Sequence, residues 1–377
     1  MKKILIVNNN LEVGGIQKSL VNLLKAEHKN YDITLLLFSR SGALLSEVPA
    51  DIKIISPKNC YKMLGLSKAE LMKHPLLLFM KTILMRYAKL FSRRQAMKLL
   101  GVFQKKISGY DTIISYSHLT NHKNFANGCG DFVLDKTVCD NKVCLIHCDY
   151  LNSGFMTSQN NEEYDLFDKI SCCSDSVKER FIQGSGIDVS KVCTLKNFCD
   201  PDIIPMSEED VQIYDKDYIN IVSVARLSVE KGIDRAIDAI YSTRRSDLRY
   251  YIVGDGPQKK FLKDKVAEYK LDDRIFFMGE QKNPYKYMAD ADYLLLSSLH
   301  EAAPVVFDEA KTLGVKIITT NTTSVEEMVG ADYGFICDNS TQGMAKVLNS
   351  IEKSHVNTYN VPTNEIQKVQ FFEILKK

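Results

Sequence analysis

The apolar positions in the first half of the chain fall into short runs, each followed by a polar loop. Such continuous runs are typical of parallel strands that are buried on both faces. After the first run, Ile16 to Ala26 carries apolar residues at helical spacing, which predicts a helix. The strands that this pattern predicts are Lys3–Val7, Ile33–Phe38, Ile52–Ser56, Thr112–Ser117, Val143–Ile146 and Ile170–Ser174.

The second half of the chain repeats this alternation of strands and helices. Helical spacing recurs from Ile233 to Ile240, and another helix is expected between Pro257 and Tyr269. The expected strands are Tyr218–Ala225, Tyr250–Val253, Arg274–Met278, Tyr293–Leu296, Lys316–Thr320 and Phe335–Cys337. The pattern therefore predicts an α/β protein with two Rossmann-like, doubly wound domains that face each other across a deep cleft.

The domain boundaries follow from length and composition. A chain of 377 residues is too long for a single core and fits two domains. The stretch 198–217 is polar and acidic and contains two prolines, which is typical of a linker. We therefore expect a first domain over 1–197, a linker over 198–217, a second domain over 218–355 and a tail over 356–377.

The composition is that of a soluble globular protein, with 45% hydrophobic and 25% charged residues. A formal net charge of +2 gives no reason to expect nucleic acid as a partner. The charge is unevenly distributed, however, because Lys58 to Lys106 contains twelve Lys or Arg residues and one acid, Glu70. This segment carries +11 and the rest of the chain −9.

The basic segment 58–106 predicts an amphipathic helix. Its apolar residues at helical spacing are Ile83, Leu84, Tyr87, Leu90 and Phe91, and its cations include Lys81, Arg86, Lys89, Arg93 and Arg94. A basic amphipathic helix can lie on an anionic membrane surface, and we expect that contact here. The alternative is that the apolar face packs on its own domain while the cations are solvated.

The start of the chain and its ten cysteines favour a cytosolic protein. The first apolar run spans only Ile4 to Val7, which is too short for a signal peptide. Without export, the cysteines are expected to be reduced. No run approaches the roughly 18 apolar residues that a membrane span needs.

Two features are expected at the carboxyl edge of the first sheet. Gly14 and Gly15 lie between a strand and a helix, where they let backbone amides approach a ligand, although a plain tight turn explains them equally. His118 and His147 directly follow strands, and a neutral imidazole there can orient a hydroxyl or phosphate. The alternative is a histidine satisfied by loop backbone. The nearby cysteines lack the paired spacing of a zinc site, so we expect no metal.

The stretch Ser297 to Gly314 places two carboxylates around the start of a helix. Glu301 follows an apolar strand, Pro304 suits the first helical turn, and Glu309 falls inside the helix. In an open parallel sheet this loop and helix N-terminus lie at the edge where ligands bind. The alternative is an ordinary strand-to-helix turn with two solvated glutamates.

Two cations follow the first strand of the same domain. Arg226 offers a planar fork and Lys231 a point charge, which suits the two phosphates of a diphosphate. The alternative is a pair of solvated surface charges.

These motifs, in this order, resemble the retaining GT-B glycosyltransferases of family 4, of the type that builds bacterial surface polysaccharides. The resemblance is carried by Arg226-x4-Lys231, by Gly254-Asp-Gly-Pro, and by Glu301-x7-Glu309 followed by Ala310 and Gly314. Gly14-Gly15, Ile146-His147, Asn197 and Glu327-Met328-Val329 are similar to the glycine loop, histidine strand end, linker entry and late turn of that family. The chain departs from the family at Ala302-Ala303, where many members have Gly-Phe.

The resemblance implies a role for each motif. Arg226 and Lys231 would hold the diphosphate of a nucleotide-sugar, Glu309 the ribose hydroxyls, and Glu301 the transferred sugar. His147 would contact the sugar or the acceptor. The remaining donor contacts that it implies are Gly14, Gly15, Gly254, Met278, Gly279, Ala302, Ala303, Pro304 and Val305, with the main chain at Met278-Gly279 near the base.

The resemblance also implies the reaction. A hexose-type sugar would pass from a UDP-sugar to a lipid-linked or polysaccharide acceptor, as in capsule assembly, with retention of configuration. The enzyme would be cytoplasmic, peripheral on the inner face of the plasma membrane, with the candidate helix Glu365–Leu375 crossing back onto the first domain. Two alternatives are a nucleotide-sugar epimerase of the same architecture and a non-catalytic carbohydrate- or lipid-binding protein.

No cofactor or metal is expected. Asp290-Ala-Asp292 matches the metal-binding motif of the other large glycosyltransferase fold, in which the carboxylates follow a strand. Here they precede the expected strand Tyr293–Leu296. We therefore expect Asp290 to be a surface acid, Asp292 to be a strand-entry residue, and the activity to be independent of metal.

Overall fold

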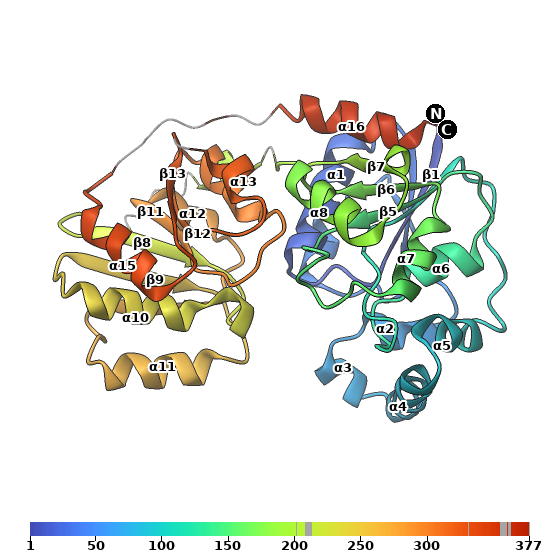
Figure 1. The fold of residues 1–377 in the computed structure, drawn as a ribbon, viewed down its shortest axis with the longest axis horizontal. Coiled ribbons are helices and arrows are strands. Elements are labelled where there is room, and N and C mark those ends of the chain that lie inside the picture. The colour runs from blue at the N-terminus through green and yellow to red at the C-terminus, as the bar shows by residue number, and fades with distance from the viewer. Residues whose placement is uncertain (201, 208–212, 331, 355–359, 361–362, 377) are drawn as a thin grey trace. The chain divides into compact units, whose positions relative to one another are not determined.

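The computed structural model describes residues 1–200, 202–207, 213–330, 332–354, 360 and 363–376. The chain divides into two compact units: unit 1 contains Met1–Phe198 and Asn364–Lys377, and unit 2 contains Cys199–Thr363 (Figure 1). Residues 201 and 208–212 of the expected linker, and 356–359, 361–362 and 377 of the expected tail, lie outside the described residues.

Unit 1 is built on a seven-stranded sheet in the order β3-β2-β1-β4-β5-β6-β7, with every described strand pair parallel. Its strands are β1 (Lys3–Asn8), β2 (Asp32–Leu37), β3 (Lys53–Ile55), β4 (Thr112–Ser115), β5 (Lys142–Ile146), β6 (Lys169–Cys172) and β7 (Val192–Thr194). Its helices are α1 (Gly15–Glu27), α2 (Lys62–Gly65), α3 (Lys68–Met72), α4 (Pro75–Leu90), α5 (Arg93–Leu100), α6 (Cys129–Lys136), α7 (Ser158–Asp165), α8 (Asp175–Ser185) and α16 (Glu365–Leu375).

Helix α16 comes from the end of the chain and completes the core of unit 1. Phe371, Ile374 and Leu375 are buried in the same apolar cluster as β1, β2 and α1. The last carbonyls of α16 lack partners within the helix, as in any helix. Side chains of unit 1 supply them: Lys2 Nζ donates to the Leu375 carbonyl (2.8 Å) and Asn141 Nδ2 to the Ile374 carbonyl (3.1 Å).

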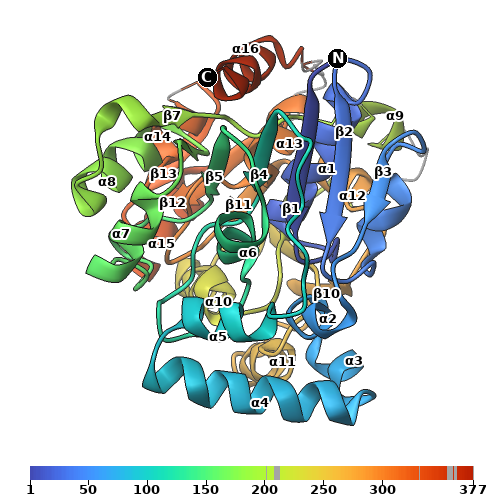
Figure 2. The same cartoon turned by 90° about the vertical axis from the view of Figure 1, so that its right-hand side faces the viewer.

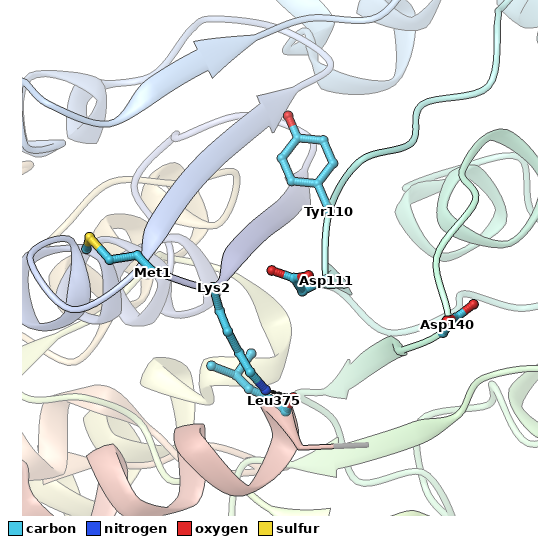
Figure 3. A pocket seen from close by; sticks show the side chains of 6 residues that line it. All are labelled: Met1, Lys2, Tyr110, Asp111, Asp140 and Leu375. Atoms are coloured by element: carbon cyan, nitrogen blue, oxygen red, sulfur yellow. Dashed lines mark hydrogen bonds between the residues drawn. The ribbon is translucent and has the colours of Figure 1, made fainter.

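A hollow of about 430 Å³ adjoins this end of α16. Met1, Lys2, Tyr110, Asp111, Asp140 and Leu375 line it (Figure 3). Tyr110 and Asp111 come just before β4, and Asp140 just before β5. The hollow therefore belongs to the amino edge of the sheet, and ligands of open parallel sheets bind at the opposite, carboxyl edge.

Unit 2 is built on a six-stranded parallel sheet in the order β10-β9-β8-β11-β12-β13. Its strands are β8 (Ile219–Val224), β9 (Leu248–Val253), β10 (Ile275–Gly279), β11 (Tyr293–Leu296), β12 (Lys316–Thr320) and β13 (Gly334–Cys337). Its helices are α9 (Ile203–Ser207), α10 (Ile233–Thr243), α11 (Lys259–Glu268), α12 (Tyr285–Ala289), α13 (Val305–Thr312), α14 (Val325–Val329) and α15 (Thr341–Ser350).

The sheet of unit 2 is buried on both faces. Leu295 and Ile318 point into one apolar cluster, which includes α10, α11 and α15. Leu294 and Ile317, their neighbours in sequence, point into a second cluster with α12, α13 and α14. Side chains that alternate along a strand thus reach two separate cores, which is why the strands are continuous apolar runs in the sequence.

The expectation that Asp290 is a surface acid is wrong. Its carboxylate accepts hydrogen bonds from the backbone amides of Ile213 (2.8 Å) and Tyr214 (2.9 Å), and it forms an ion pair with Lys216. Asp290 therefore fastens the segment before β8 to the end of α12. Asp292 is buried at the start of β11 and accepts a hydrogen bond from the Asn220 amide (2.8 Å).

The basic segment 58–106 forms the short helices α2 and α3, then α4 and α5. Figures 1 and 2 both show α4 and α5 at the end of unit 1 opposite α16. Asn10 Nδ2 of the loop after β1 donates to the Gly65 carbonyl of α2 (2.5 Å), which fixes this segment to the carboxyl edge of the sheet. None of the helices in the described ranges combines the length and apolar character that crossing a bilayer requires.

The expectation that Arg93 is a surface cation is wrong. Arg93 is 1% exposed, and its guanidinium forms ion pairs with Asp131 of α6 (2.8 Å) and Glu163 of α7. Arg94 also points inward, to Asp135 (3.0 Å). These two arginines hold α5 on unit 1 instead of supplying charge to the outer surface.

Candidate functional site

The strand order of unit 2 defines where a ligand would bind. The chain winds outward from β8 through β9 to β10 on one side, and then returns to β11 on the other side. The carboxyl ends of β8 and β11 thus flank the point at which the winding direction reverses. In open α/β sheets a crevice forms at this switch point, and ligands bind there.

The loop after β8 carries both predicted cations. Arg226 is exposed and has no ion pair among the described residues. Lys231 ends the short 3₁₀ turn Val229–Lys231, and Gly232 then turns the chain into α10 at φ +59°. A Cβ atom at Gly232 would lie 2.3 Å from the Ser297 carbonyl oxygen, so glycine is needed for the β8 and β11 loops to approach this closely.

Hydrogen bonds join these two loops across the switch point. Ser297 Oγ donates to the Lys231 carbonyl (2.9 Å), and the Leu299 amide donates to the Glu230 carbonyl (2.8 Å). Arg235 Nη2 donates to the Ser297 carbonyl (2.8 Å). The backbone around Lys231 is therefore held by the loop that carries Glu301.

Lys231 and Glu301 form an ion pair at this point. Lys231 Nζ lies 2.5 Å from Glu301 Oε1, and Ser298 Oγ donates to the same carboxylate oxygen (2.7 Å). The two charged side chains remain partly open to solvent, with exposed fractions of 26% for Lys231 and 13% for Glu301. A cation that is held in place but still accessible is suited to exchange its carboxylate partner for an incoming anion.

The loop after β9 packs against the loop that carries Arg226. Gly254 has φ +144°, and a Cβ atom there would lie 2.0 Å from the Ala225 carbonyl oxygen. The Leu227 amide donates to the Asp255 carbonyl (2.9 Å), and the Gly254 amide donates to the Gly279 carbonyl (2.8 Å). The Gly-Asp-Gly-Pro motif therefore positions the backbone beside Arg226. Gly279, at φ +72°, ends β10 with open space around its Cβ position.

Helix α13 begins beside Glu301. Pro304 is its N-cap, and Val305 is its first residue. Glu309 lies on the helix, is 9% exposed, and accepts a hydrogen bond from Tyr285 Oη (3.2 Å). Ala302 is buried and Ala303 is partly buried. The Met278 carbonyl accepts a hydrogen bond from Gln281 Nε2 (2.6 Å), so one of its lone pairs is already engaged.

The structure thus joins Lys231 to Glu301 directly and places Arg226 and Gly254 on adjoining loops. Sequence reasoning missed Gly232, Ser297, Ser298 and Tyr285. A signal was present for the first three, because a Lys-Gly step precedes a helix and a Ser-Ser pair follows a buried strand. No sequence pattern pointed to Tyr285, because its hydrogen-bond partner Glu309 is 24 residues away in the chain.

Unit 1 has its own switch point, between β1 and β4. Ser117 Oγ donates to Asn8 Oδ1 across it (2.9 Å). Gly14 is the N-cap of α1 in extended conformation, and no side chain caps that helix. Gly15 is exposed, with nothing within 4 Å of its Cβ position. The first-turn amides of α1 are therefore open to a ligand.

His147 follows β5 and lies against Tyr116, with 5.3 Å between the ring centroids. Its imidazole donates to the Tyr116 backbone carbonyl, while Nε2 is buried without a hydrogen-bond partner in the described part of the chain. Burial, with a smaller contribution from His118, lowers the pKa of His147 to about 3. Burial also lowers the pKa of His118 to about 4. Both imidazoles are therefore neutral at pH 7.

Comparison with solved structures identifies the fold. The crystal structure of Anabaena Alr3699/HepE in complex with UDP and glucose superposes with a TM-score of 0.67 at 18% identity, covering 100% of this chain and 97% of that one. WaaG, a glycosyltransferase of lipopolysaccharide biosynthesis, gives a TM-score of 0.60 at 15% identity, covering 92% and 89%. The chain has the GT-B fold, with two parallel-sheet α/β domains.

Sequence comparison adds a family match for part of the chain. Residues 207–369 are similar to the family of glycosyl transferases group 1. One component of the human phosphatidylinositol N-acetylglucosaminyltransferase is 27% identical over 184 residues, which are 48% of this chain and 37% of that protein.

A bacterial relative is similar over a comparable length. The N-acetylgalactosamine-N,N'-diacetylbacillosaminyl-diphospho-undecaprenol 4-alpha-N-acetylgalactosaminyltransferase of Campylobacter jejuni is 28% identical over 202 residues, or 51% of this chain and 54% of that protein. The matched part of the chain thus spans between about a third and a half of the length of these two relatives.

Proposed function

We propose that the protein is a retaining glycosyltransferase that moves a hexose-type sugar from a UDP-sugar to a lipid-linked or polysaccharide acceptor. The observation that carries this proposal is the ion pair between Lys231 and Glu301 beside the exposed Arg226, at the switch point of the unit 2 sheet. Two cations of different geometry on one loop suit the two phosphates of a diphosphate.

The donor would displace Glu301 from Lys231. The diphosphate would take up the ammonium of Lys231 and the guanidinium of Arg226, and the released Glu301 carboxylate would accept hydrogen bonds from sugar hydroxyls. Glu309 is assigned to the ribose hydroxyls, and the main chain at Met278 and Gly279 to the base. Gly254 supports the Arg226 loop, and the backbone of Ala302, Ala303, Pro304 and Val305 adjoins the sugar.

The reaction needs charge stabilisation more than it needs a protein nucleophile. Breaking the bond between sugar and phosphate leaves additional negative charge on the diphosphate and an oxocarbenium-like sugar. Fixed cations that bind this charge more strongly in the transition state than in the ground state accelerate the step. The leaving diphosphate can itself accept the proton of the acceptor hydroxyl, which gives attack on the same face and retention.

The proposed activity does not depend on a metal. Arg226 and Lys231 supply the positive charge that a divalent metal supplies in other transferases. The carboxylates of Asp290 and Asp292 both accept hydrogen bonds from backbone amides, and Asp290 also forms an ion pair with Lys216. They are structural carboxylates, so the Asp-x-Asp spacing does not indicate a metal site.

Gly14, Gly15 and His147 of unit 1 are assigned to the acceptor and the reacting sugar. The neutral imidazole of His147 would accept a hydroxyl proton at Nε2, an unpaired atom that is buried and that a local movement would have to expose. The exposed first turn of α1 offers backbone amides to an anionic group.

The names of the relatives support a lipid-linked acceptor. The Campylobacter jejuni relative is named for a diphospho-undecaprenol substrate, and a Mycobacterium tuberculosis relative, 30% identical over 135 residues, for a phosphatidylinositol dimannoside. We place the enzyme in the cytoplasm, peripheral on the inner face of the plasma membrane, where the basic segment 58–106 contacts anionic lipid.

A donor screen tests this function. The purified protein is incubated with UDP-glucose, UDP-N-acetylglucosamine, UDP-galactose and GDP-mannose, with and without membrane-extracted lipid acceptors, and the released nucleotide is measured. Acceptor-dependent release from a UDP-sugar, unchanged in EDTA and absent in Arg226→Ala, is expected. Sugar conversion without any acceptor would assign an epimerase instead, and binding without turnover would assign a non-catalytic protein.

A further inference from the structure

Helix α4 has an apolar face on each of its two sides. Leu84 and Ala88 are buried against unit 1 and account for its packing there. The expected apolar face grouped Leu84 with Ile83 and Leu90, but the structure separates them, since Leu84 points inward while Ile83 and Leu90 point outward. A helix that is apolar on both sides needs a second apolar environment besides its own core.

The outward face is a continuous stripe. Leu76, Phe79, Ile83 and Leu90 have exposed fractions of 71%, 63%, 48% and 76%. Their spacing puts all four on one side of the helix. Large apolar side chains exposed singly are ordinary, whereas a stripe along one helix face indicates a binding surface. We call Leu76, Phe79, Ile83 and Leu90 the α4 stripe.

The stretch of sequence that contains the α4 stripe carries cations and no acids. From Leu71 to Tyr110 the sequence contains no aspartate or glutamate. Lys81 Nζ is used inside unit 1, where it donates to the Met63 carbonyl (2.8 Å). Arg86 and Lys89, one helical turn apart on α4, are exposed and form no ion pair among the described residues. Both cations lie beside the α4 stripe and are exposed to solvent, so they can contact an anionic surface.

We propose that the α4 stripe inserts into the surface of an anionic lipid bilayer, with α4 lying in the plane of the membrane and Arg86 and Lys89 at the level of the phosphates. A basic amphipathic helix with large apolar residues on its other side binds membranes in this way. A second copy of the chain is a poor partner for the α4 stripe. A symmetric dimer contact would bring two cationic segments without acidic residues together, and they would repel each other. This inference refines the proposed membrane location and rests on it, but it does not depend on the transfer activity.

The position of α4 connects this surface to the acceptor side of unit 1. The Arg93 amide at the start of α5 donates to the His122 carbonyl (2.6 Å), in the loop that follows β4 and carries His118. Arg93 also donates to the Thr120 carbonyl of that loop. Figure 2 shows α4 beneath α5 at the carboxyl edge of the sheet. A lipid-anchored substrate that emerges beside α4 would therefore meet the edge on which His147 and Gly15 lie.

A single introduced tryptophan tests the inference, because the chain contains none. Phe79→Trp is compared with Phe261→Trp, which alters a 52% exposed residue on the lysine-bearing helix α11 of unit 2. Each variant is mixed at low salt with equimolar phosphatidylglycerol and phosphatidylcholine vesicles, with and without brominated acyl chains. A blue shift and bromine quenching are expected for Phe79→Trp only, and neither is expected with pure phosphatidylcholine.

Sedimentation of the unlabelled protein provides a second measurement. Phe79→Ser should lower vesicle partitioning about tenfold, since the lost burial of one large apolar side chain is worth about that factor. Arg86→Ala with Lys89→Ala should weaken binding and flatten its salt dependence. Absence of a blue shift with anionic vesicles would overturn the inference, as would a shift produced only by an acidic polypeptide such as polyglutamate. If the protein does not bind anionic vesicles but turns over a soluble acceptor normally, the membrane inference is wrong and the proposed function is unaffected.

Discussion

Lys231 Nζ and Glu301 Oε1 lie 2.5 Å apart across the switch point of the unit 2 sheet, and they come from loops that follow different strands. The pair satisfies both charges when no ligand is bound. Ser298 Oγ donates to the same carboxylate oxygen (2.7 Å). A donor diphosphate would have to replace one charge-assisted contact by another, so the site can open to an anion without leaving Lys231 unpaired.

Gly254 is predicted to be required for the stability of unit 2. Any side chain at this position would place Cβ 2.0 Å from the Ala225 carbonyl oxygen, in addition to the strain of φ +144°. Gly254→Ala should lower the free energy of unfolding by about 2 kcal/mol or more, as measured by urea titration with far-UV circular dichroism. Gly279→Ala is the control, because its Cβ position is open and only the φ of +72° is unfavourable. Equal losses for the two variants would contradict the packing argument.

His147 is predicted to act as a neutral acceptor. Its pKa of about 3 keeps it unprotonated throughout the physiological range. His147→Gln should lower kcat roughly 10- to 100-fold, with little change in nucleotide affinity. Its titration should add no inflection between pH 5 and 8, so the pH profile of kcat should keep its shape in the variant. His28→Gln, at a histidine paired with Asp51 (2.9 Å), is the control. An inflection near pH 6.5 that disappears with His147 would contradict this assignment.

Glu163 is predicted to make unit 1 less stable as pH rises. Burial raises the pKa of Glu163 from 4.5 to about 7. Arg93 opposes this rise, and the negative charge of Asp131 adds to it. The folded chain therefore binds more protons than the unfolded chain between pH 4.5 and 7, and stability falls as pH rises through that window. Thermal melts from pH 5 to 8 should show this fall. The fall should be smaller in Glu163→Gln and unchanged in Glu162→Gln, whose residue is exposed.

Phe371 is predicted to be a core residue of unit 1 although it lies near the end of the chain. It is fully buried and packs edge-on against Tyr31, with ring centroids 5.5 Å apart. Phe371→Ala should cost about 3–5 kcal/mol in urea unfolding. Phe372→Ala, at a neighbouring residue that is 46% exposed, should cost less than about 0.5 kcal/mol. Similar costs for both would show that α16 does not belong to this core.

The elements that the sequence pattern predicted best are buried on both sides. Tyr293–Leu296 was expected as a strand and is β11 with the same bounds, because a central parallel strand is apolar along its whole length. β7 was not predicted, since Val192–Thr194 is a three-residue edge strand with no apolar run. The direction of the α4 side chains could not be predicted either, because that helix is apolar on both sides and its periodicity fits more than one orientation.

The candidate site was predictable in its parts but not in its contacts. Arg226, Lys231 and Glu301 follow strands, and strand ends of a parallel sheet share one edge. Their pairing depends on Gly232, which allows the close approach of the Ser297 carbonyl, and such an approach leaves no periodic signal. The inward direction of Arg93 was hidden for a similar reason, because its partners Asp131 and Glu163 are 38 and 70 residues away in the chain.

The most direct test of the account is nucleotide binding by variants of the Lys231–Glu301 pair. Isothermal titration with UDP, and with GDP in parallel, is compared for the native chain, Lys231→Ala, Glu301→Gln and the control Lys263→Ala. Lys231→Ala should weaken binding of the preferred nucleotide roughly 10- to 100-fold. Glu301→Gln should bind it as tightly as the native chain or more tightly, because Lys231 is released, while turnover falls about 100-fold or more. Native-like affinity in Lys231→Ala for whichever nucleotide binds, or no binding of either nucleotide to the native chain, would contradict the account.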